Sequence, residues 1–351
     1  ALPPRLHHRV PGGQPLTAII AFSRTGCQTA EKVAALTGEA ALYAPERLAQ
    51  PPFLPIEKPF ADFYGRLFRS HSALIFVGSV GIAVREIAPH LRSKATDPAV
   101  ISLDELGRFV IPILSGHIGG ANALAARLAR GLGATPVITT ATDIQHRFSV
   151  DAWAARNGYQ ISSLAAAKAV SAAILEGDVP ICADFPLPEI LPPGTCPGRT
   201  GPIGIYIGYR RDNPFAQTLH LIPKVLHLGI GCRRGISKEA VARAVTAVLE
   251  EQGIYPAAIR CAASIDLKAR EPGLLDYCRE MGLPIRFYPA QTLQAVPGCF
   301  PASEFVKSVT GVDNVCQRAA LVGAEKTIVE KCAIDGVTVS LAVEKVEVSF
   351  E

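Results

Sequence analysis

The chain has 351 residues, of which 49% are hydrophobic and 19% charged, and its formal net charge is +4. This composition excludes an intrinsically disordered chain, and the length predicts two or three domains. There is no basic stripe with interleaved aromatic residues, and no apolar stretch reaches the roughly 20 residues of a membrane helix. Nucleic-acid binding and membrane insertion are therefore not expected, whereas the slight positive charge suits a substrate rich in carboxylates.

Nine cysteines are scattered along the chain, and no two have the C-x-x-C spacing. An odd number with such wide spacing argues against a disulfide framework and against a zinc site. We therefore expect reduced thiols, a cytoplasmic protein and no bound metal. Residues 1–16 are proline-rich and lack periodicity, which indicates a loose tail.

The pattern of residues 17–142 predicts an amino-terminal α/β domain. Apolar runs indicate strands, and 3.6-residue patterns indicate helices, whereas the prolines of residues 45–59 indicate a loop. The predicted strands are 17–22, 72–77, 100–103, 108–114 and 135–140, and the predicted helices are 29–36, 82–91 and 121–132. Such alternation predicts a mainly parallel sheet covered by helices.

Residues 143–222 predict a less regular middle or linker region, with helices at 152–157 and 164–176 and a strand at 203–209. Residues 223–351 then predict a second α/β domain. Its predicted strands are 225–230, 258–263, 285–288 and 338–343, and its predicted helices are 238–252 (capped by Ser237), 273–281 and 312–324. The expected fold is two α/β domains with mainly parallel sheets, joined by this irregular region.

The segment SGHIGGAN, Ser115 to Asn122, lies between a predicted strand and a predicted helix. Gly116, Gly119 and Gly120 permit positive φ and let a ligand approach the backbone. The free N–H groups of the helix start favour an anion or a developing oxyanion. His117, at the middle of the turn, is a candidate acid or base. The alternative is a tight turn with a surface histidine.

A second glycine turn, Gly78 to Gly81, also joins a predicted strand to a helix. Because ligands of open α/β sheets bind outside the carboxyl ends of the strands, we expect both turns at one edge of the sheet. Asp143 follows a predicted strand and faces that edge, or else caps the next helix. Asp104 and Glu105 are candidate acids, or simply residues of a hairpin turn.

The string GIGCRRG at 229–235 has Arg234 where the dinucleotide fingerprint needs a glycine, and the chain has no G-K-[ST] motif. A nicotinamide enzyme is disfavoured, and a P-loop is excluded. Arg233 and Arg234 are suited to bidentate capture of carboxylates, although two solvated arginines are an equally good interpretation.

Taken together, these motifs resemble the CbiG family of cobalamin biosynthesis, the cobalt-precorrin-5A hydrolases. The resemblance covers most of the chain through long strings such as FVGSVGIAVREIAPHL, FVIPILSGHIGGANALA, LGIGCRRGISKEAV and PASEFVKSVTGVDNVCQRAAL. It is weak over residues 150–220, and Arg270 stands where an acidic residue is expected.

The resemblance implies a reaction in which the δ-lactone of a cobalt-containing contracted-corrin precursor is opened. A two-carbon unit then leaves as acetaldehyde, which gives cobalt-precorrin-5B. The cobalt belongs to the substrate, so no further cofactor is expected. The implied partner is this small corrinoid, without nucleic acid or membrane, and transient contact with neighbouring pathway enzymes is compatible with it.

Within that reaction His117 is the predicted general base, and the N–H groups of Gly119 and Gly120 are predicted oxyanion donors. Asp143 and Glu105 are the predicted acids. A non-catalytic corrinoid carrier and a sugar-phosphate or nucleotide-binding protein remain the alternative functions. The residues predicted to bind substrate are Ser115, Gly116, Gly119, Gly120, Asn122, Gly78, Gly81, Arg85, Lys94, Arg233, Arg234 and Lys268.

Overall fold

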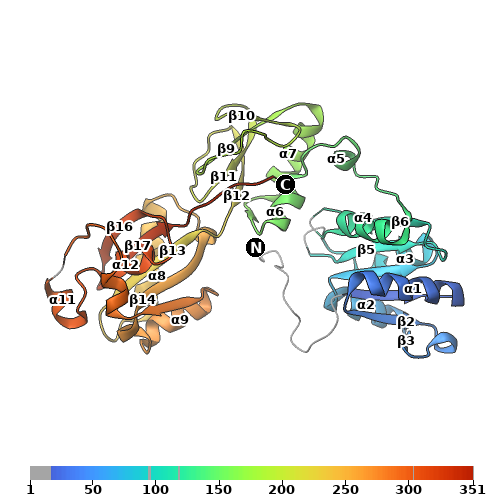
Figure 1. The fold of residues 1–351 in the computed structure, drawn as a ribbon, viewed down its shortest axis with the longest axis horizontal. Helices are drawn as coiled ribbons and strands as arrows, with labels where there is room; N and C mark the ends of the chain where they lie inside the picture. The colour runs from blue at the N-terminus through green and yellow to red at the C-terminus, as the bar shows by residue number, and fades with distance from the viewer. Residues whose placement is uncertain (1–16, 94–95, 118, 303, 351) are drawn as a thin grey trace. The chain divides into compact units, whose positions relative to one another are not determined.

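The computed structural model describes residues 17–93, 96–117, 119–302 and 304–350 (Figure 1). Contacts within the chain divide it into two compact units, one up to Arg156 and one from Asn157. This division falls later than the boundary predicted at residue 142. None of the helices in the described ranges is both long and apolar enough to cross a membrane.

A seven-stranded sheet forms the centre of the first unit, in the order β3-β2-β1-β4-β5-β6-β7. The strands β1, β4 and β5 are almost entirely buried, because helices cover both faces of the sheet, and they therefore read as continuous apolar runs. The strands are β1 (Thr17–Ala21), β2 (Ala40–Ala44), β3 (Phe53–Pro55), β4 (Ala73–Val77), β5 (Ala99–Leu103), β6 (Phe109–Leu114) and β7 (Thr135–Pro136).

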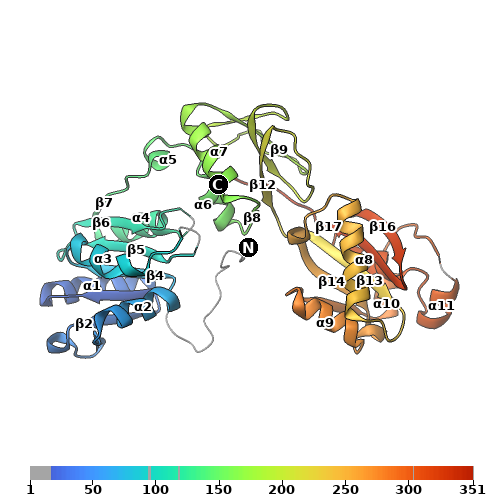
Figure 2. The same cartoon turned by 180° about the vertical axis from the view of Figure 1, so that it is seen from behind.

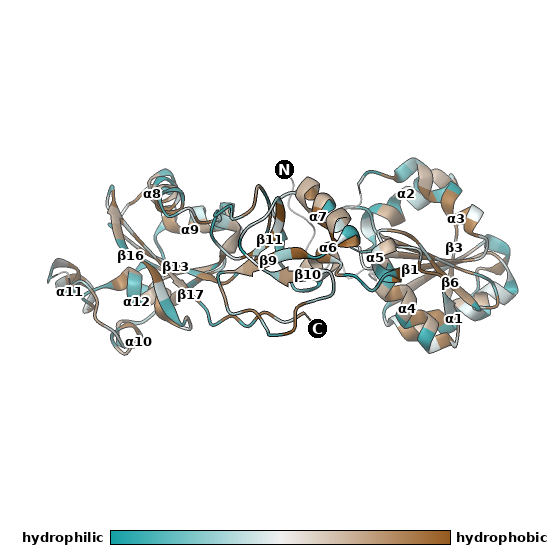
Figure 3. Ribbon diagram, turned by 90° about the horizontal axis from the view of Figure 1, so that it is seen from above, coloured by the Kyte–Doolittle hydropathy of each residue, from teal (hydrophilic) through white to brown (hydrophobic). Residues whose placement is uncertain are grey.

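Two helices cover each face of this sheet. The helices α1 (Arg24–Thr37) and α4 (Ala121–Leu132) pack on one face, and α2 (Phe60–Ser70) and α3 (Val80–Ile87) on the other (Figure 2). Hydrophobic residues concentrate in the strands, whereas the helices alternate between apolar and polar residues (Figure 3). The predicted three-layer α/β arrangement is confirmed, although β2, β3 and α2 were not predicted.

The strand β6 runs antiparallel to β5, which has a consequence for the site. A tight turn over residues 104–107 joins the two strands, closed by a hydrogen bond from Gly107 N–H to the Asp104 carbonyl (2.8 Å), and Val100 pairs with Leu114. The carboxyl end of β6 therefore lies at the edge where β4 and β5 begin. The prediction that both glycine turns share one edge is wrong, because β4 is parallel to β5.

Residues 157–222 are more regular than the sequence predicted. They form a five-stranded sheet in the order β10-β9-β11-β12-β8. Its elements are β8 (Gln160–Ile161), α7 (Leu164–Glu176), β9 (Val179–Ala183), β10 (Thr195–Pro197), β11 (Ile203–Ile207) and β12 (Gln217–Ile222). Most of the prolines that suggested an irregular region lie in loops, and Pro197 lies in an edge strand, where no ladder hydrogen bond is lost.

The carboxyl-terminal sheet has the order β15-β14-β13-β17-β16. Its strands are β13 (Leu226–Cys232), β14 (Ile259–Ile265), β15 (Ile285–Tyr288), β16 (Lys326–Ile334) and β17 (Val337–Val343). The helices α8 (Lys238–Glu251) and α9 (Pro272–Glu280) pack on one face, and α10 (Ala290–Gln294) and α12 (Val315–Leu321) pack on the other. Between α10 and α12, the chain forms the short helix α11 (Glu304–Thr310).

Short 3₁₀ helices occupy Glu46–Leu48, Ala88–His90, Pro256–Ala258 and Asp266–Lys268. The predicted cap of α8 is confirmed, since the Ser237 hydroxyl accepts a hydrogen bond from Ala240 N–H. With mainly parallel sheets flanked by helices, the predicted α/β fold class is confirmed.

Candidate active site

The turn between β6 and α4 is closed by its own backbone. The N–H groups of Ala121 and Asn122 donate to the carbonyls of Ser115 (3.1 Å) and Gly116 (3.0 Å). Gly120 has a left-handed φ of 78° and donates its N–H to the carbonyl of His117 (2.9 Å). The first N–H groups of α4 are thus satisfied internally. The prediction that Gly120 offers a free N–H to an oxyanion is wrong.

His117 lies between two carboxylates. Its Nε2 atom is 2.9 Å from Oδ2 of Asp143, and its Nδ1 atom is 3.2 Å from Oδ1 of Asp151. The Thr142 hydroxyl lies 3.3 Å from Nε2. Since carboxylates accept hydrogen bonds, a ring that bonds to both of them carries a proton on each nitrogen and is an imidazolium.

Asp143 lies in α5 (Ala141–Ile144), a short helix that follows β7. The Asn122 side-chain amide donates to Asp143 Oδ2 (2.8 Å) and to the Thr140 hydroxyl (2.9 Å). Asp143 is inside α5 and not at its cap, so the capping interpretation is wrong. Three residues predicted for the site, His117, Asp143 and Asn122, therefore meet at one edge of the first sheet.

Asp151 was not predicted. It lies at the start of α6 (Val150–Arg156), and its Oδ1 atom also accepts hydrogen bonds from the Ser149 hydroxyl (3.1 Å) and from Ala152 N–H (2.9 Å). The sequence signal was weak: an aspartate directly before a predicted helix indicates a capping residue, and nothing local connects it to a turn more than thirty residues earlier.

The two carboxylates differ in exposure. The side chain of Asp151 is 10% exposed, that of His117 is 17% exposed and that of Asp143 is 36% exposed. Water and a substrate can therefore reach the His117 ring from the side of Asp143, whereas the mostly buried Asp151 supports the ring from the other side.

Both neighbours act on the charge of the ring. The hydrogen bond to Asp151 raises the pKa of His117; burial opposes it, and the bond to Asp143 adds to the rise. Burial alone would raise the pKa of Asp151, but the hydrogen bonds from His117, Ser149 and Ala152 outweigh burial and lower it. The site thus holds a positive ring between negative side chains.

The other predicted residues of the first unit lie elsewhere. Gly78, Gly81 and Glu105 lie at or near the carboxyl ends of β4 and β5, which is the opposite edge from His117. A five-residue strand spans about 16 Å, so the structure does not bring Glu105 to His117. Arg85 is exposed on α3, and Lys94 lies outside the described residues.

Asp104 and Ser115 have structural partners. Asp104 Oδ1 accepts from the N–H groups of Arg108 and Phe109, both at 2.7 Å, which favours the hairpin-turn interpretation. The Ser115 hydroxyl donates to the Asp97 carbonyl (3.0 Å), which ties the turn to the segment before β5. Ser115 therefore fixes the position of the turn.

The second unit places its predicted cations after β13 and β14. Arg233 and Arg234 are exposed, whereas Lys268 pairs with the buried Glu271 (3.2 Å), which also accepts from Gly235 N–H (2.7 Å). The positive charge of Lys268 is thus compensated inside the protein.

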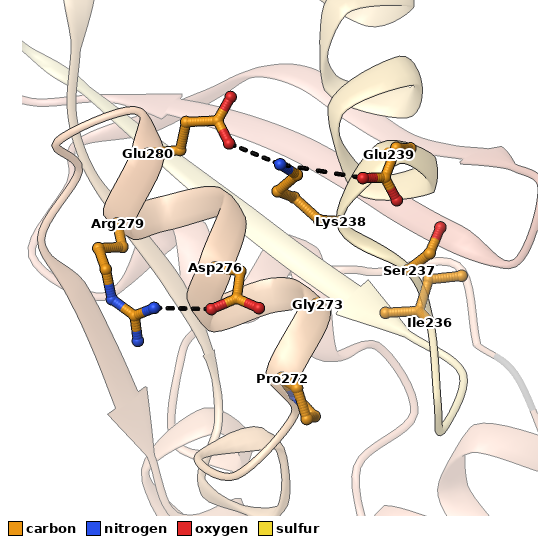
Figure 4. Close-up of a pocket in the computed structure, with 9 residues that line it drawn as sticks. All are labelled: Ile236, Ser237, Lys238, Glu239, Pro272, Gly273, Asp276, Arg279 and Glu280. Carbon is orange, nitrogen blue, oxygen red and sulfur yellow. Dashed lines mark hydrogen bonds and ion pairs between the residues drawn. The ribbon is translucent and has the colours of Figure 1, made fainter.

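A shallow depression of about 640 Å³ lies between the start of α8 and the length of α9 (Figure 4). Two ion pairs, Lys238 with Glu280 and Arg279 with Asp276, both at 2.7 Å, neutralise most of its charge. None of the predicted site residues lines it. We therefore place no site there.

Within the described ranges, no group of three or more His, Cys, Asp or Glu side chains is placed to hold a metal ion. The expectation that the protein needs no cofactor of its own stays a prediction.

Two family models match the chain: "Cobalamin synthesis G N-terminal" over residues 62–143 and "Cobalamin synthesis G C-terminus" over residues 226–342. The first match includes His117 and Asp143 but ends before Asp151. The amino-terminal and carboxyl-terminal halves of the resemblance are therefore found in the expected order.

Known relatives cover nearly the whole chain. A cobalt-precorrin-5A hydrolase of Salmonella typhimurium is 34% identical over 93% of this chain and 97% of its own length. One from Priestia megaterium is 33% identical over 79% of each chain. The crystal structure of a cobalamin biosynthesis protein G homologue from Sulfolobus solfataricus is 21% identical, with a TM-score of 0.40 over 93% of this chain and 96% of that one. The extent of these sequence matches shows that the chain belongs to the CbiG family of cobalamin biosynthesis.

Proposed function

We propose that this chain hydrolyses cobalt-precorrin-5A, opening its δ-lactone and releasing acetaldehyde to leave cobalt-precorrin-5B. The observation that carries the proposal is the His117 ring, which is held between the buried carboxylate of Asp151 and the solvent-reachable carboxylate of Asp143. His117 and Asp143 lie in the segment matched by the family model. The names of the relatives at 34% and 33% identity support the substrate. The cobalt is part of the substrate.

The reaction needs one water molecule. Water adds to the lactone carbonyl, and the acyl C–O bond breaks to give a carboxylate and an alkoxide. The alkoxide then forms the carbonyl of acetaldehyde as the adjacent carbon–carbon bond breaks. The electron pair of that bond stays on the macrocycle, which takes up a proton.

The geometry favours an exchange of the roles predicted for His117 and Asp143. A ring that is protonated on both nitrogens is a donor, so His117 suits stabilisation of the lactone oxyanion and later delivery of a proton. Asp143, whose side chain is solvent-reachable, suits acceptance of the proton from water. Asn122 holds Asp143 in place beside the Nε2 atom of His117, on the side of the ring that solvent can reach.

Exposed arginines are proposed to hold the carboxylate arms of the substrate. Arg85, Arg233 and Arg234 remain candidates because their guanidinium groups are exposed, whereas Lys268 is the weaker candidate because Glu271 neutralises it. We also propose a cytoplasmic location, which the nine unpaired cysteines support, since thiols stay reduced there.

The proposal is tested by incubating the pure protein with enzymatically prepared cobalt-precorrin-5A and trapping aldehydes. We expect acetaldehyde in proportion to the corrinoid converted, and we expect His117→Ala and Asp143→Asn each to lower kcat by roughly 100-fold or more. Tight corrinoid binding without acetaldehyde would instead establish the carrier function.

A further inference from the structure

We propose that Asp151 is a positioning residue, which acts on the reaction through His117 by holding the ring in its doubly protonated form with Nε2–H directed toward the substrate side. This inference rests on the proposed function for its catalytic consequence, although its effect on the ring can be measured without any substrate.

The first argument is the geometry around Nδ1. Asp151 Oδ1 is 3.2 Å from His117 Nδ1, and the same oxygen accepts from the Ser149 hydroxyl and from Ala152 N–H. A carboxylate fixed by two further donors does not follow the ring when it rotates. The Nδ1 proton is therefore held in one direction, which fixes the orientation of the other ring nitrogen.

The second argument is the difference between the two carboxylates. Asp151 is only 7% exposed as a residue, so a broad macrocycle finds almost no surface of it to contact. Asp143 contacts the opposite ring nitrogen and is open to solvent. Asp151 cannot itself touch the substrate, but it can set the charge of the ring that does.

The third argument is electrostatic. The charged groups that act on the ring are Asp151 and Asp143, and the bond to Asp151 has the largest effect on the pKa of His117. Removal of the Asp151 charge should therefore lower that pKa and leave the ring neutral, and hence a poorer donor, over part of the working pH range.

The test is D151N, because the amide keeps the size of the side chain and can still accept a hydrogen bond from Nδ1. We expect the alkaline limb of the kcat profile to move to lower pH and kcat above that limb to fall by roughly 10- to 100-fold, with KM unchanged. In NMR titrations of ¹⁵N-histidine-labelled protein, the His117 signal, assigned by its loss in H117A, should titrate at lower pH in D151N.

The single tryptophan provides a structural control. Trp153 lies on the same helix as Asp151, is 2% exposed and packs against Phe148 with ring centroids 5.9 Å apart. Unchanged Trp153 emission in D151N shows that α6 is still packed. D62N removes the same charge from an exposed position on α2 and should leave the pH profile unaltered.

D151E should restore part of the pH profile, because it returns the charge. A pH profile and a His117 titration that are the same in D151N and in the wild type would overturn the inference. If the wild type releases no acetaldehyde but the titration still moves in D151N, the proposed function fails while the link between Asp151 and His117 holds.

Discussion

The glycines of the β6–α4 turn allow the position of His117 to be perturbed separately from stability. A Cβ atom on Gly119 would lie 2.3 Å from Cβ of Ser115 and 2.8 Å from its carbonyl oxygen. Non-bonded carbon atoms separate at about 3.5–4 Å, so G119A must move the turn by more than 1 Å. Ser115 resists this movement, since its hydroxyl is bonded to the Asp97 carbonyl.

The neighbouring position provides a matched control. A Cβ atom on Gly120 would meet no atom within 4 Å, and the cost of G120A comes from its positive φ of 78°. That cost is about 1–2 kcal/mol, which is close to the roughly 1–3 kcal/mol of overpacking expected in G119A. The two variants should therefore lose similar stability but differ in how far His117 moves.

We expect G119A to lower kcat by about 100-fold, the effect of a 1 Å misplacement of a catalytic group, and G120A to lower it by no more than several-fold. Stability is measured by urea unfolding followed through Trp153 emission, which reports on the unit that contains the turn. Equal losses of kcat in both variants, or full activity in G119A, would refute the argument that turn geometry positions His117.

Three further predictions concern stability. Burial lowers the pKa of His71 below its unfolded value of about 6.5. The contribution of His71 to the free energy of unfolding is therefore complete above that pH and falls as the pH decreases through the folded pKa. His71→Leu should remove this pH dependence from the midpoint of urea unfolding. The pKa of His227 is raised, first by its hydrogen bond with Cys261 and also by the bond to Glu344 (2.9 Å). The contribution of His227 to the free energy of unfolding is therefore complete below about pH 6.5 and is lost at higher pH. E344Q should weaken this pH dependence in thermal unfolding followed by circular dichroism. Ser237→Ala should destabilise the carboxyl-terminal sheet by about 1 kcal/mol, because Ala240 N–H loses its capping acceptor; an unchanged unfolding midpoint would contradict this.

Local signals in the sequence predicted the single elements well. The helices α4 and α7 and the strand β15 have the bounds that periodicity predicted, and Ser237 caps α8 as expected. These features depend on the hydrophobic pattern and on neighbouring residues, and therefore a single sequence contains the necessary information.

The missed elements depend on more distant partners. The strand β7 has two residues where six were predicted, because Thr135 and Pro136 pair only with the start of β6 at the sheet edge. The short strands β8 and β10 are stable only because β12 and β9 were available to pair with them. No periodicity develops over two or three residues, so the sheet of residues 157–222 could not be predicted as such.

The same difference between local and distant information explains the site. The residue types of the turn indicated chemistry at His117, but the direction of β6 decided which side chains it meets. Had β6 run parallel to β5, His117 would lie with Gly78 and Glu105, as the rule for open α/β sheets suggested. Because the turn at 104–107 reverses the chain, the histidine instead lies beside residues that follow β7.

This reversal also explains why the second carboxylate is so far along the chain. At the edge where β4 and β5 begin, the chain after β7 passes over the turn, first with Asp143 and then with Asp151. An exposed partner and a buried partner are thus supplied by two successive short helices, neither of which belongs to the sheet. The position of His117 between these two carboxylates follows from strand direction, and for this reason the D151N titration tests the contact that the fold creates, whether or not the proposed chemistry holds.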